Sequence, residues 1–315
     1  MIGRSACGWF PSAPRRSEGE VGGIHRPLRW RYIGVVTMVL SAALLLSILE
    51  TIEQRLIFFP TKYPEGIWHP ERLGLRVEDV TFTTQDDLRL HGWWIEGESV
   101  RAAVILFFHG NAGNITDRIG LLHRLRRCGH HLFIFDYRGY GRSEGSPSEG
   151  GLYRDGIAAW HHLTRTRAIP PERIVLFGRS LGGAVAAEVA LRGEAAGLIL
   201  ESTFTSIPDM ARALYPFLPV GHLLRTRFET IAKIGAISMP LLVLHGTKDD
   251  LVPFEFGRRL YEKAGSARKS FHAVVGAGHN DTDLVGGAAY LQVIDRFVRS
   301  VTERGENGEE KRAEE

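Results

Sequence analysis

The feature that most constrains this chain is an alternation of short, continuous apolar runs with stretches of helical periodicity. The apolar runs are Ala103–Phe108, Leu132–Asp136, Ile174–Phe177, Leu198–Leu200, Leu241–Leu244 and Phe271–Val275. The helical stretches cover residues 117–128, 151–165, 181–192, 255–264 and 287–302. Strands that are apolar along their whole length are typical of a parallel sheet covered by helices on both faces. The sequence therefore predicts an α/β fold with a mostly parallel central sheet.

Two further segments precede this region and alternate polar with apolar residues. Val77–Thr83 and Leu88–Ile95 have the two-residue period of half-buried strands, and residues 85–87 between them favour a turn. We expect these segments to form a hairpin at one edge of the sheet.

The domain boundaries follow from where this pattern begins and ends. One α/β domain is predicted over residues 76–302, with residues 50–75 as the linker and the start of the body. Within the domain, residues 206–236 contain three prolines and are too long for a simple connection. They are predicted to form a small helical cap over one end of the sheet.

An uncharged apolar segment of 18 residues, Tyr32–Leu49, precedes the linker. As a helix it would be about 27 Å long, close to the ~30 Å hydrocarbon core of a bilayer. A cleaved signal peptide would have a shorter apolar run, a shorter leader and a small-residue cleavage site. A buried core helix of this length would usually carry a polar face. We therefore predict a single transmembrane anchor.

Charge is distributed unevenly around this anchor. Residues 1–31 form a flexible basic tail with six Arg and two Glu, and residues 303–315 form an acidic tail with six Glu and three basic side chains. Since Lys and Arg favour the cytoplasmic side of a membrane, the N-terminus is predicted to be cytoplasmic. The domain would then lie on the periplasmic, lumenal or extracellular side. The net charge of +3 leaves a nearly neutral body, so no nucleic-acid partner is expected.

A nucleophile motif lies between the third apolar run and the helical stretch that follows it. Gly178-Arg179-Ser180-Leu181-Gly182 has the G-x-S-x-G pattern. Between a strand and a helix, this pattern forms a sharp turn that exposes the serine, and its glycines allow neighbouring backbone to approach. Ser180 is the predicted nucleophile, with Gly178 and Gly182 as the elbow glycines. A helix N-cap serine is the alternative interpretation.

Two later strand-to-loop transitions supply an acid and a base. Asp249 follows the fifth apolar run, and His279 lies in a glycine-rich loop after the sixth. The chain order Ser, Asp, His is the one that α/β-hydrolases use, and all three positions fall at the carboxyl ends of parallel strands, where such sheets bind ligands. We predict that Ser180, Asp249 and His279 form a catalytic triad. Asp250 and Glu201 are the alternative acids.

Acyl transfer at a serine also needs two backbone N–H groups that stabilise the developing oxyanion. One is predicted from Leu181, directly after the nucleophile, and the other from Asn111, in the glycine-rich loop after the first apolar run.

The sequence has no G-x-G-x-x-G or Walker phosphate loop and no clustered Cys and His at metal-binding spacing. No cofactor and no metal are expected.

Six motifs together resemble one family. They are FFHGNAGN (107–114), FDYRGYGRSEGSPSEGG (135–151), GRSLGGAVA (178–186), ESTFTSIPDMA (201–211), HGTKDDLVP (245–253) and GAGHNDT (276–282). They are similar to those of the membrane-anchored α/β-hydrolases of the Bem-like, alpha/beta hydrolase domain-containing group, over about residues 56–302. The resemblance implies an N-terminal anchor and a nucleophile, acid and base at Ser180, Asp249 and His279. It also implies conformational roles for residues 136–143 and for Asp281.

The sequence thus predicts a membrane-anchored serine hydrolase that cleaves ester or thioester bonds through an acyl-enzyme intermediate. Its expected partners are the membrane and a small-molecule or acylated-protein substrate of lipid-like character. A serine peptidase or amidase would share all of these residues, and a non-catalytic scaffold of the same fold is the second alternative. The oligomeric state is left open.

Overall fold

The computed structural model describes residues 28–217 and 224–313 and divides into two units, Met1–Leu49 and Glu50–Glu315. Residues 1–27 of the expected basic tail lie outside the described residues. In the first unit, the described residues belong to α1 (Leu28–Ile57), which continues into the second unit. Its part Val36–Ile57 is long and apolar enough to cross a membrane. The predicted N-terminal apolar helix is therefore present, with wider bounds than 32–49.

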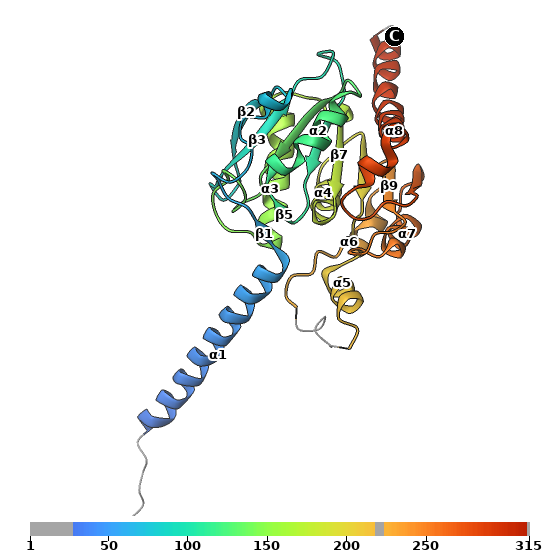
Figure 1. The fold of residues 1–315 in the computed structure, drawn as a ribbon. Coiled ribbons are helices and arrows are strands. Elements are labelled where there is room, and N and C mark those ends of the chain that lie inside the picture. Colours follow the sequence, from blue (N-terminus) through green and yellow to red (C-terminus); the bar gives the residue numbers. More distant parts are fainter. Residues whose placement is uncertain (1–27, 218–223, 314–315) are drawn as a thin grey trace, which may run out of the picture. The chain divides into compact units, whose positions relative to one another are not determined.

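Among the described residues, the second unit is built on an eight-stranded sheet in the order β10-β9-β8-β7-β4-β6-β3-β2 (Figure 1). The strands are β2 (Glu78–Thr83), β3 (Arg89–Ile95), β4 (Val104–Phe108), β6 (His131–Phe135), β7 (Ile174–Arg179), β8 (Gly197–Glu201), β9 (Leu241–Gly246) and β10 (Lys269–Val274). The strands from β10 to β6 are parallel, whereas β3 is antiparallel to β6 and β2 to β3. The mostly parallel sheet and the edge hairpin are as predicted.

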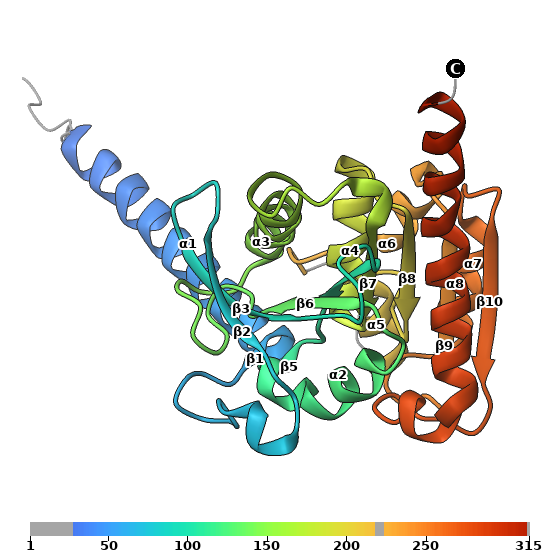
Figure 2. The ribbon, with the colours of Figure 1, turned by 90° about the horizontal axis from the view of Figure 1, so that it is seen from above.

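Helices cover both faces of this sheet. The α-helices are α2 (Ile119–Arg126), α3 (Glu149–His161), α4 (Leu181–Arg192), α5 (Ile207–Leu214), α6 (Thr230–Lys233), α7 (Phe254–Lys263) and α8 (Thr282–Ala313). Short 3-10 turns are η1 (Pro70–Leu73), η2 (Ile115–Arg118), η4 (Pro171–Arg173) and η6 (Ile234–Ala236), and a π-turn, η3 (His162–Thr166), extends α3. Figure 2 shows α3 and α4 on one side of the sheet and α2 on the other.

Each face of the sheet has its own apolar core, because successive strand residues point to opposite faces. In β4, Leu106 belongs to the core that includes Leu152 of α3 and Ala184 of α4, and Phe107 belongs to the core that includes Leu122 of α2. Burial on both faces explains why these strands are continuous apolar runs in the sequence.

The segments predicted as the linker and as the cap both contain regular secondary structure. The linker predicted over 50–75 holds the end of α1, η1 and a two-residue strand, β1 (Phe59–Pro60). This strand was not predicted, and it pairs in parallel with β5 (Ala112–Gly113), in the loop after β4. The cap predicted over 206–236 contains α5, α6 and η6, and residues 218–223 lie outside the described part. Figure 1 shows α5 beyond the ends of the strands.

The C-terminal end differs from the sequence expectation. The helix predicted over 287–302 begins at Thr282, turns at Gly287, where φ is 51°, and runs to Ala313. Residues 303–313 of the expected tail are thus helical. Opposite charges four residues apart, such as Arg299 and Glu303 at 3.8 Å, favour this continuation.

Candidate active site

The turn between β7 and α4 places Ser180 in a strained backbone conformation. Ser180 has φ 54° and ψ −121°, a region that residues other than glycine rarely adopt and that recurs at functional turns. Its N–H donates to the Glu201 carbonyl oxygen at 2.8 Å, and its carbonyl oxygen accepts from Thr203 Oγ1 at 2.7 Å. Backbone and side-chain contacts from the end of β8 and the residues after it therefore hold the turn.

The two glycines of the turn are required because there is no room for a Cβ atom at either position. A Cβ atom on Gly178 would lie 2.4 Å from the carbonyl oxygen of Gly182. A Cβ atom on Gly182 would lie 2.0 Å from the carbonyl oxygen of Phe108, in β4. Both obstacles are backbone atoms, so no rotamer change relieves them, and the start of α4 packs directly against β4.

His279 connects Ser180 with Asp249. Its Nε2 lies 3.0 Å from Ser180 Oγ, and its Nδ1 lies 2.8 Å from Asp249 Oδ2. The backbone orients the carboxylate, since Asp249 Oδ1 accepts from the N–H groups of Leu251 at 3.1 Å and Val252 at 2.8 Å. The structure thus brings together the three residues that the sequence singled out, from the ends of β7, β9 and β10.

A second histidine, which the sequence analysis did not single out, approaches the same carboxylate. His245 on β9 is fully buried, and its Nε2 lies 3.4 Å from Asp249 Oδ2 and 3.0 Å from the Val252 carbonyl oxygen. Burial alone raises the pKa of Asp249, but hydrogen bonds from His245 and His279 more than offset it and hold the pKa well below its usual range. Asp249 is therefore ionised at neutral pH, in the form that can orient an imidazole.

The two alternative acids lie in other environments. Glu201 is fully buried at the end of β8, where it accepts hydrogen bonds from Tyr290 Oη at 2.9 Å and from Thr282 Oγ1. Asp250 is exposed, and the hydrogen bonds described for the His279 ring go to Asp249 and Ser180 instead.

The two predicted oxyanion residues border the nucleophile. Asn111 is fixed by its side chain, whose Nδ2 donates to the Ile57 carbonyl oxygen at 2.9 Å. Its carbonyl oxygen accepts from the Phe59 N–H at 3.0 Å and from Tyr140 Oη at 2.8 Å. None of these contacts uses the Asn111 backbone N–H. Leu181 is the first residue of α4, a position whose N–H has no acceptor within the helix.

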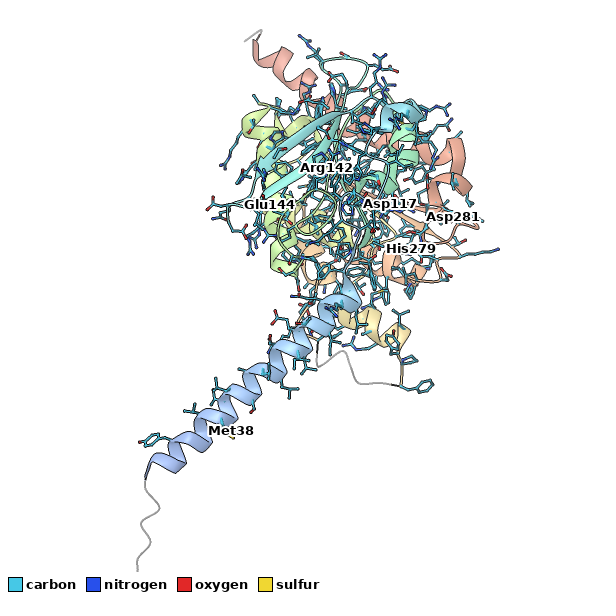
Figure 3. All side chains as sticks on the ribbon, turned by 60° about the vertical axis from the view of Figure 1, so that its left-hand side comes forward. Met38, Asp117, Arg142, Glu144, His279 and Asp281 are labelled. Carbon is cyan, nitrogen blue, oxygen red and sulfur yellow. The ribbon has the colours of Figure 1, made fainter. Side chains whose placement is uncertain are left out.

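Two pockets meet at Ser180. An apolar pocket of about 540 Å³ is lined mainly by side chains of α1, α5 and the adjoining loops, including Leu56, Phe204, Met210, Ala211, Leu214 and Val252. A polar pocket of about 500 Å³ is lined by residues that include Asp117, Arg118, Arg179, His279 and Asn280. Figure 3 shows Asp117 and His279 on the same side of the molecule. In the part of the chain that the structure describes, no group of three or more His, Cys, Asp or Glu is placed to hold a metal ion.

Family models and a solved structure match this fold. Residues 103–220 match the model of the alpha/beta hydrolase fold, and residues 220–280 match that of serine aminopeptidase S33. A Pyrococcus furiosus esterase of known structure superposes with a TM-score of 0.66 at 22% identity, over 78% of this chain and 98% of the esterase. The predicted α/β-hydrolase fold is confirmed.

Relatives extend over most of the chain. An uncharacterized protein of Mycobacterium tuberculosis is 36% identical over 88% of this chain and 99% of its own length. Protein bem46 of Schizosaccharomyces pombe is 35% identical over 78% of this chain and 85% of its own. An uncharacterized membrane protein of Saccharomyces cerevisiae is 37% identical over 73% of this chain and 82% of its own length. The chain belongs to the Bem46-like family of α/β-hydrolases, as its motifs indicated.

Proposed function

We propose that this protein is a membrane-anchored serine hydrolase that cleaves carboxylic ester or thioester bonds. The observation that carries the proposal is the series of contacts from Ser180 Oγ to His279 Nε2, 3.0 Å, and from His279 Nδ1 to Asp249 Oδ2, 2.8 Å. A serine hydroxyl is a weak nucleophile, and this arrangement supplies both a base and the group that orients the base.

The proposed reaction follows this geometry. Ser180 Oγ attacks the acyl carbon while His279 Nε2 takes its proton, and Asp249 stabilises the imidazolium. The N–H groups of Asn111 and Leu181 hydrogen-bond to the oxyanion. The bond between the acyl carbon and the leaving oxygen or sulfur then breaks, and His279 gives the proton to the leaving atom. A water molecule that His279 deprotonates hydrolyses the acyl-serine and restores the enzyme.

The two pockets indicate how a substrate would lie. His279 lines the polar pocket and does not line the apolar one. Because His279 must reach the leaving atom, the leaving group belongs in the polar pocket. The acyl chain then occupies the apolar pocket, which favours lipid-like or acylated substrates.

Membrane anchorage is part of the proposal. It is supported by the apolar span Val36–Ile57 and by the yeast relative that is named a membrane protein. Arg26, Arg29 and Arg31 precede the apolar segment, and Glu50 and Glu53 follow it. This bias favours a cytoplasmic N-terminus and a catalytic domain on the opposite side.

A serine peptidase or amidase is the second candidate function. The match of residues 220–280 to the serine aminopeptidase model favours it. It would use the same residues and differ in the leaving atom, which would be nitrogen.

Labelling of membrane preparations with a fluorophosphonate probe tests the proposal. Wild-type protein should be labelled and Ser180→Ala should not. A series of oxygen esters, thioesters and amides with one common acyl chain then distinguishes the two candidate functions. Folded wild-type protein that resists the probe would overturn the enzyme proposal in favour of the non-catalytic scaffold. Equal labelling of Ser180→Ala would overturn the assignment of Ser180 as the nucleophile.

A further inference from the structure

Arg118 lines the polar pocket, and its guanidinium has no ion-pair partner among the described residues. Its Nη2 donates to the Ala112 carbonyl oxygen at 2.5 Å, and its buried Nε has no hydrogen-bond partner in the described structure. Among the described residues, no carboxylate forms an ion pair with it within 4.0 Å. Burial, and then the neighbouring Arg179 guanidinium, lower the pKa of Arg118, but an arginine stays charged.

The other Arg and Asp side chains that line the pocket are Arg179 and Asp117. Arg179 is buried, its Nη2 donates to the His279 carbonyl oxygen at 3.1 Å, and its Nε lies 3.8 Å from Glu201 Oε1. Asp117 is exposed, and its Oδ2 accepts from the Asn114 N–H at 2.8 Å. Asp117 also raises the pKa of Arg118 electrostatically, but it forms no ion pair with Arg118 within 4.0 Å. Arg118 is therefore the arginine of the pocket that has no ion-pair partner among the described residues.

We propose that the polar pocket binds an anionic group, a phosphate or a carboxylate, carried by the leaving group of the substrate, and that Arg118 is its main ligand. This inference rests on the proposed function, because the position of His279 decides which pocket receives the leaving group. The planar fork of a guanidinium matches both anions. The substrate class is thus an ester or thioester that joins an apolar acyl chain to an anionic leaving group, as in an acyl glycerol phosphate.

Two esters that differ only in the anion test this inference. They are 1-decanoylglycerol and 1-decanoylglycerol 3-phosphate, which share the acyl chain and the scissile bond. In the wild type, kcat/KM should be at least about tenfold higher for the phosphate ester, since a hydrogen bond to a charged group has this effect. Arg118→Gln should lower the ratio of the two kcat/KM values about tenfold, mainly through the KM of the phosphate ester, and Arg118→Lys should retain part of it.

The matched control is Arg126→Gln. Arg126 is exposed on α2 and does not line the pocket, so its replacement removes the same charge from the surface. This variant should keep the wild-type ratio. A loss of preference as large as that of Arg118→Gln would point to a long-range effect of net charge and overturn the assignment to Arg118.

The outcomes separate this inference from the proposed function. Equal kcat/KM values for the two esters in the wild type, or an unchanged ratio in Arg118→Gln, overturn the anion site and leave the hydrolase standing. Folded wild-type protein that turns over neither ester and shows no Ser180-dependent labelling overturns the proposed hydrolase function itself.

Inorganic phosphate provides a second measurement that needs no anionic substrate. It should inhibit hydrolysis of the neutral ester competitively, about tenfold more weakly in Arg118→Gln than in the wild type. If phosphate inhibits the wild type and Arg118→Gln equally, the anion does not bind at Arg118.

Discussion

Asp136 is a buried carboxyl group whose pKa lies close to neutral pH. It is fully buried after β6, its Oδ1 accepts from the Ile115 N–H at 2.9 Å, and its Oδ2 has no partner in the described structure. Burial raises its pKa to about 8, against the opposing effect of the backbone hydrogen bond from Ile115. Asp136 is therefore mainly protonated at neutral pH in the folded protein.

This raised pKa predicts that the free energy of unfolding falls as the pH rises. Between the unfolded pKa, about 3.9, and the folded pKa near 8, the folded state holds a proton that the unfolded state has lost. Asp136→Asn does not titrate, so its Tm relative to the wild type should increase from pH 5 through pH 8 and level off above about pH 9. Thermal unfolding followed by circular dichroism measures this. A Tm difference that is independent of pH would show that Asp136 does not titrate in this range.

The residues of the candidate site could be predicted where neighbouring residues in the sequence mark them. Ser180, Asp249 and His279 stand directly after apolar runs and among glycines, and a single sequence shows both features. His245 and Arg118 were not singled out, because their importance depends on which groups they meet in space. His245 approaches Asp249 across a turn, and Arg118 matters because its buried Nε has no hydrogen-bond partner in the described structure.

At the scale of elements, the packing of α4 against β4 depends on Gly182. Gly182→Ala would place a Cβ 2.0 Å from a backbone oxygen, whereas a Cβ on Gly276, where φ is +83°, would meet nothing within 4 Å. We expect Gly276→Ala to cost about 1 kcal/mol through backbone strain alone, roughly 3 °C in Tm. Gly182→Ala should cost more than about 3 kcal/mol or prevent folding. Calorimetry of both variants tests this, and equal Tm losses would contradict the close packing.

Helix α5 is expected to limit the acyl chain. Ala211 lines the apolar pocket and is buried, whereas Ala213, two residues on, is exposed and does not line it. Ala211→Phe should lower the ratio of kcat/KM for decanoyl over butyryl nitrophenyl esters about tenfold, because the ring occupies space that the longer chain needs. Ala213→Phe, the same substitution on the exposed side, should keep the wild-type ratio. Similar profiles for both variants would place the acyl chain outside this pocket.

Long and buried elements were predicted more accurately than short or exposed ones. The buried strands and α4 were located to within about two residues, because burial on both faces leaves an uninterrupted apolar pattern. The pair β1–β5 has two residues in each strand, too few to show any period. The extension of α8 was missed because charge composition alone does not distinguish an exposed helix from a solvated tail.

At the scale of the whole molecule, the distribution of charge around the apolar segment predicts topology. In a bacterial host, a C-terminal alkaline phosphatase fusion should be active and a C-terminal green fluorescent protein fusion dark, because the proposed orientation places the domain across the membrane from the cytoplasm. Replacing Arg26, Arg29 and Arg31 with Glu should shift molecules toward the opposite orientation. A bright fluorescent fusion with inactive phosphatase would place the catalytic domain in the cytoplasm.

The short pair β1–β5 has a practical consequence for any attempt to work with a soluble fragment. Phe59 and Thr61 donate their N–H groups to the carbonyl oxygens of Asn111 and Gly113, both at 3.0 Å, and Ile57 accepts from the Asn111 side chain. A fragment that starts at Lys62 would lack all three contacts. It could fold around its intact sheet and still leave the loop of Asn111 unsupported. Solubility should therefore be sought by cutting near residue 50, since the last turns of α1 and the strand β1 hold the loop of Asn111 in place.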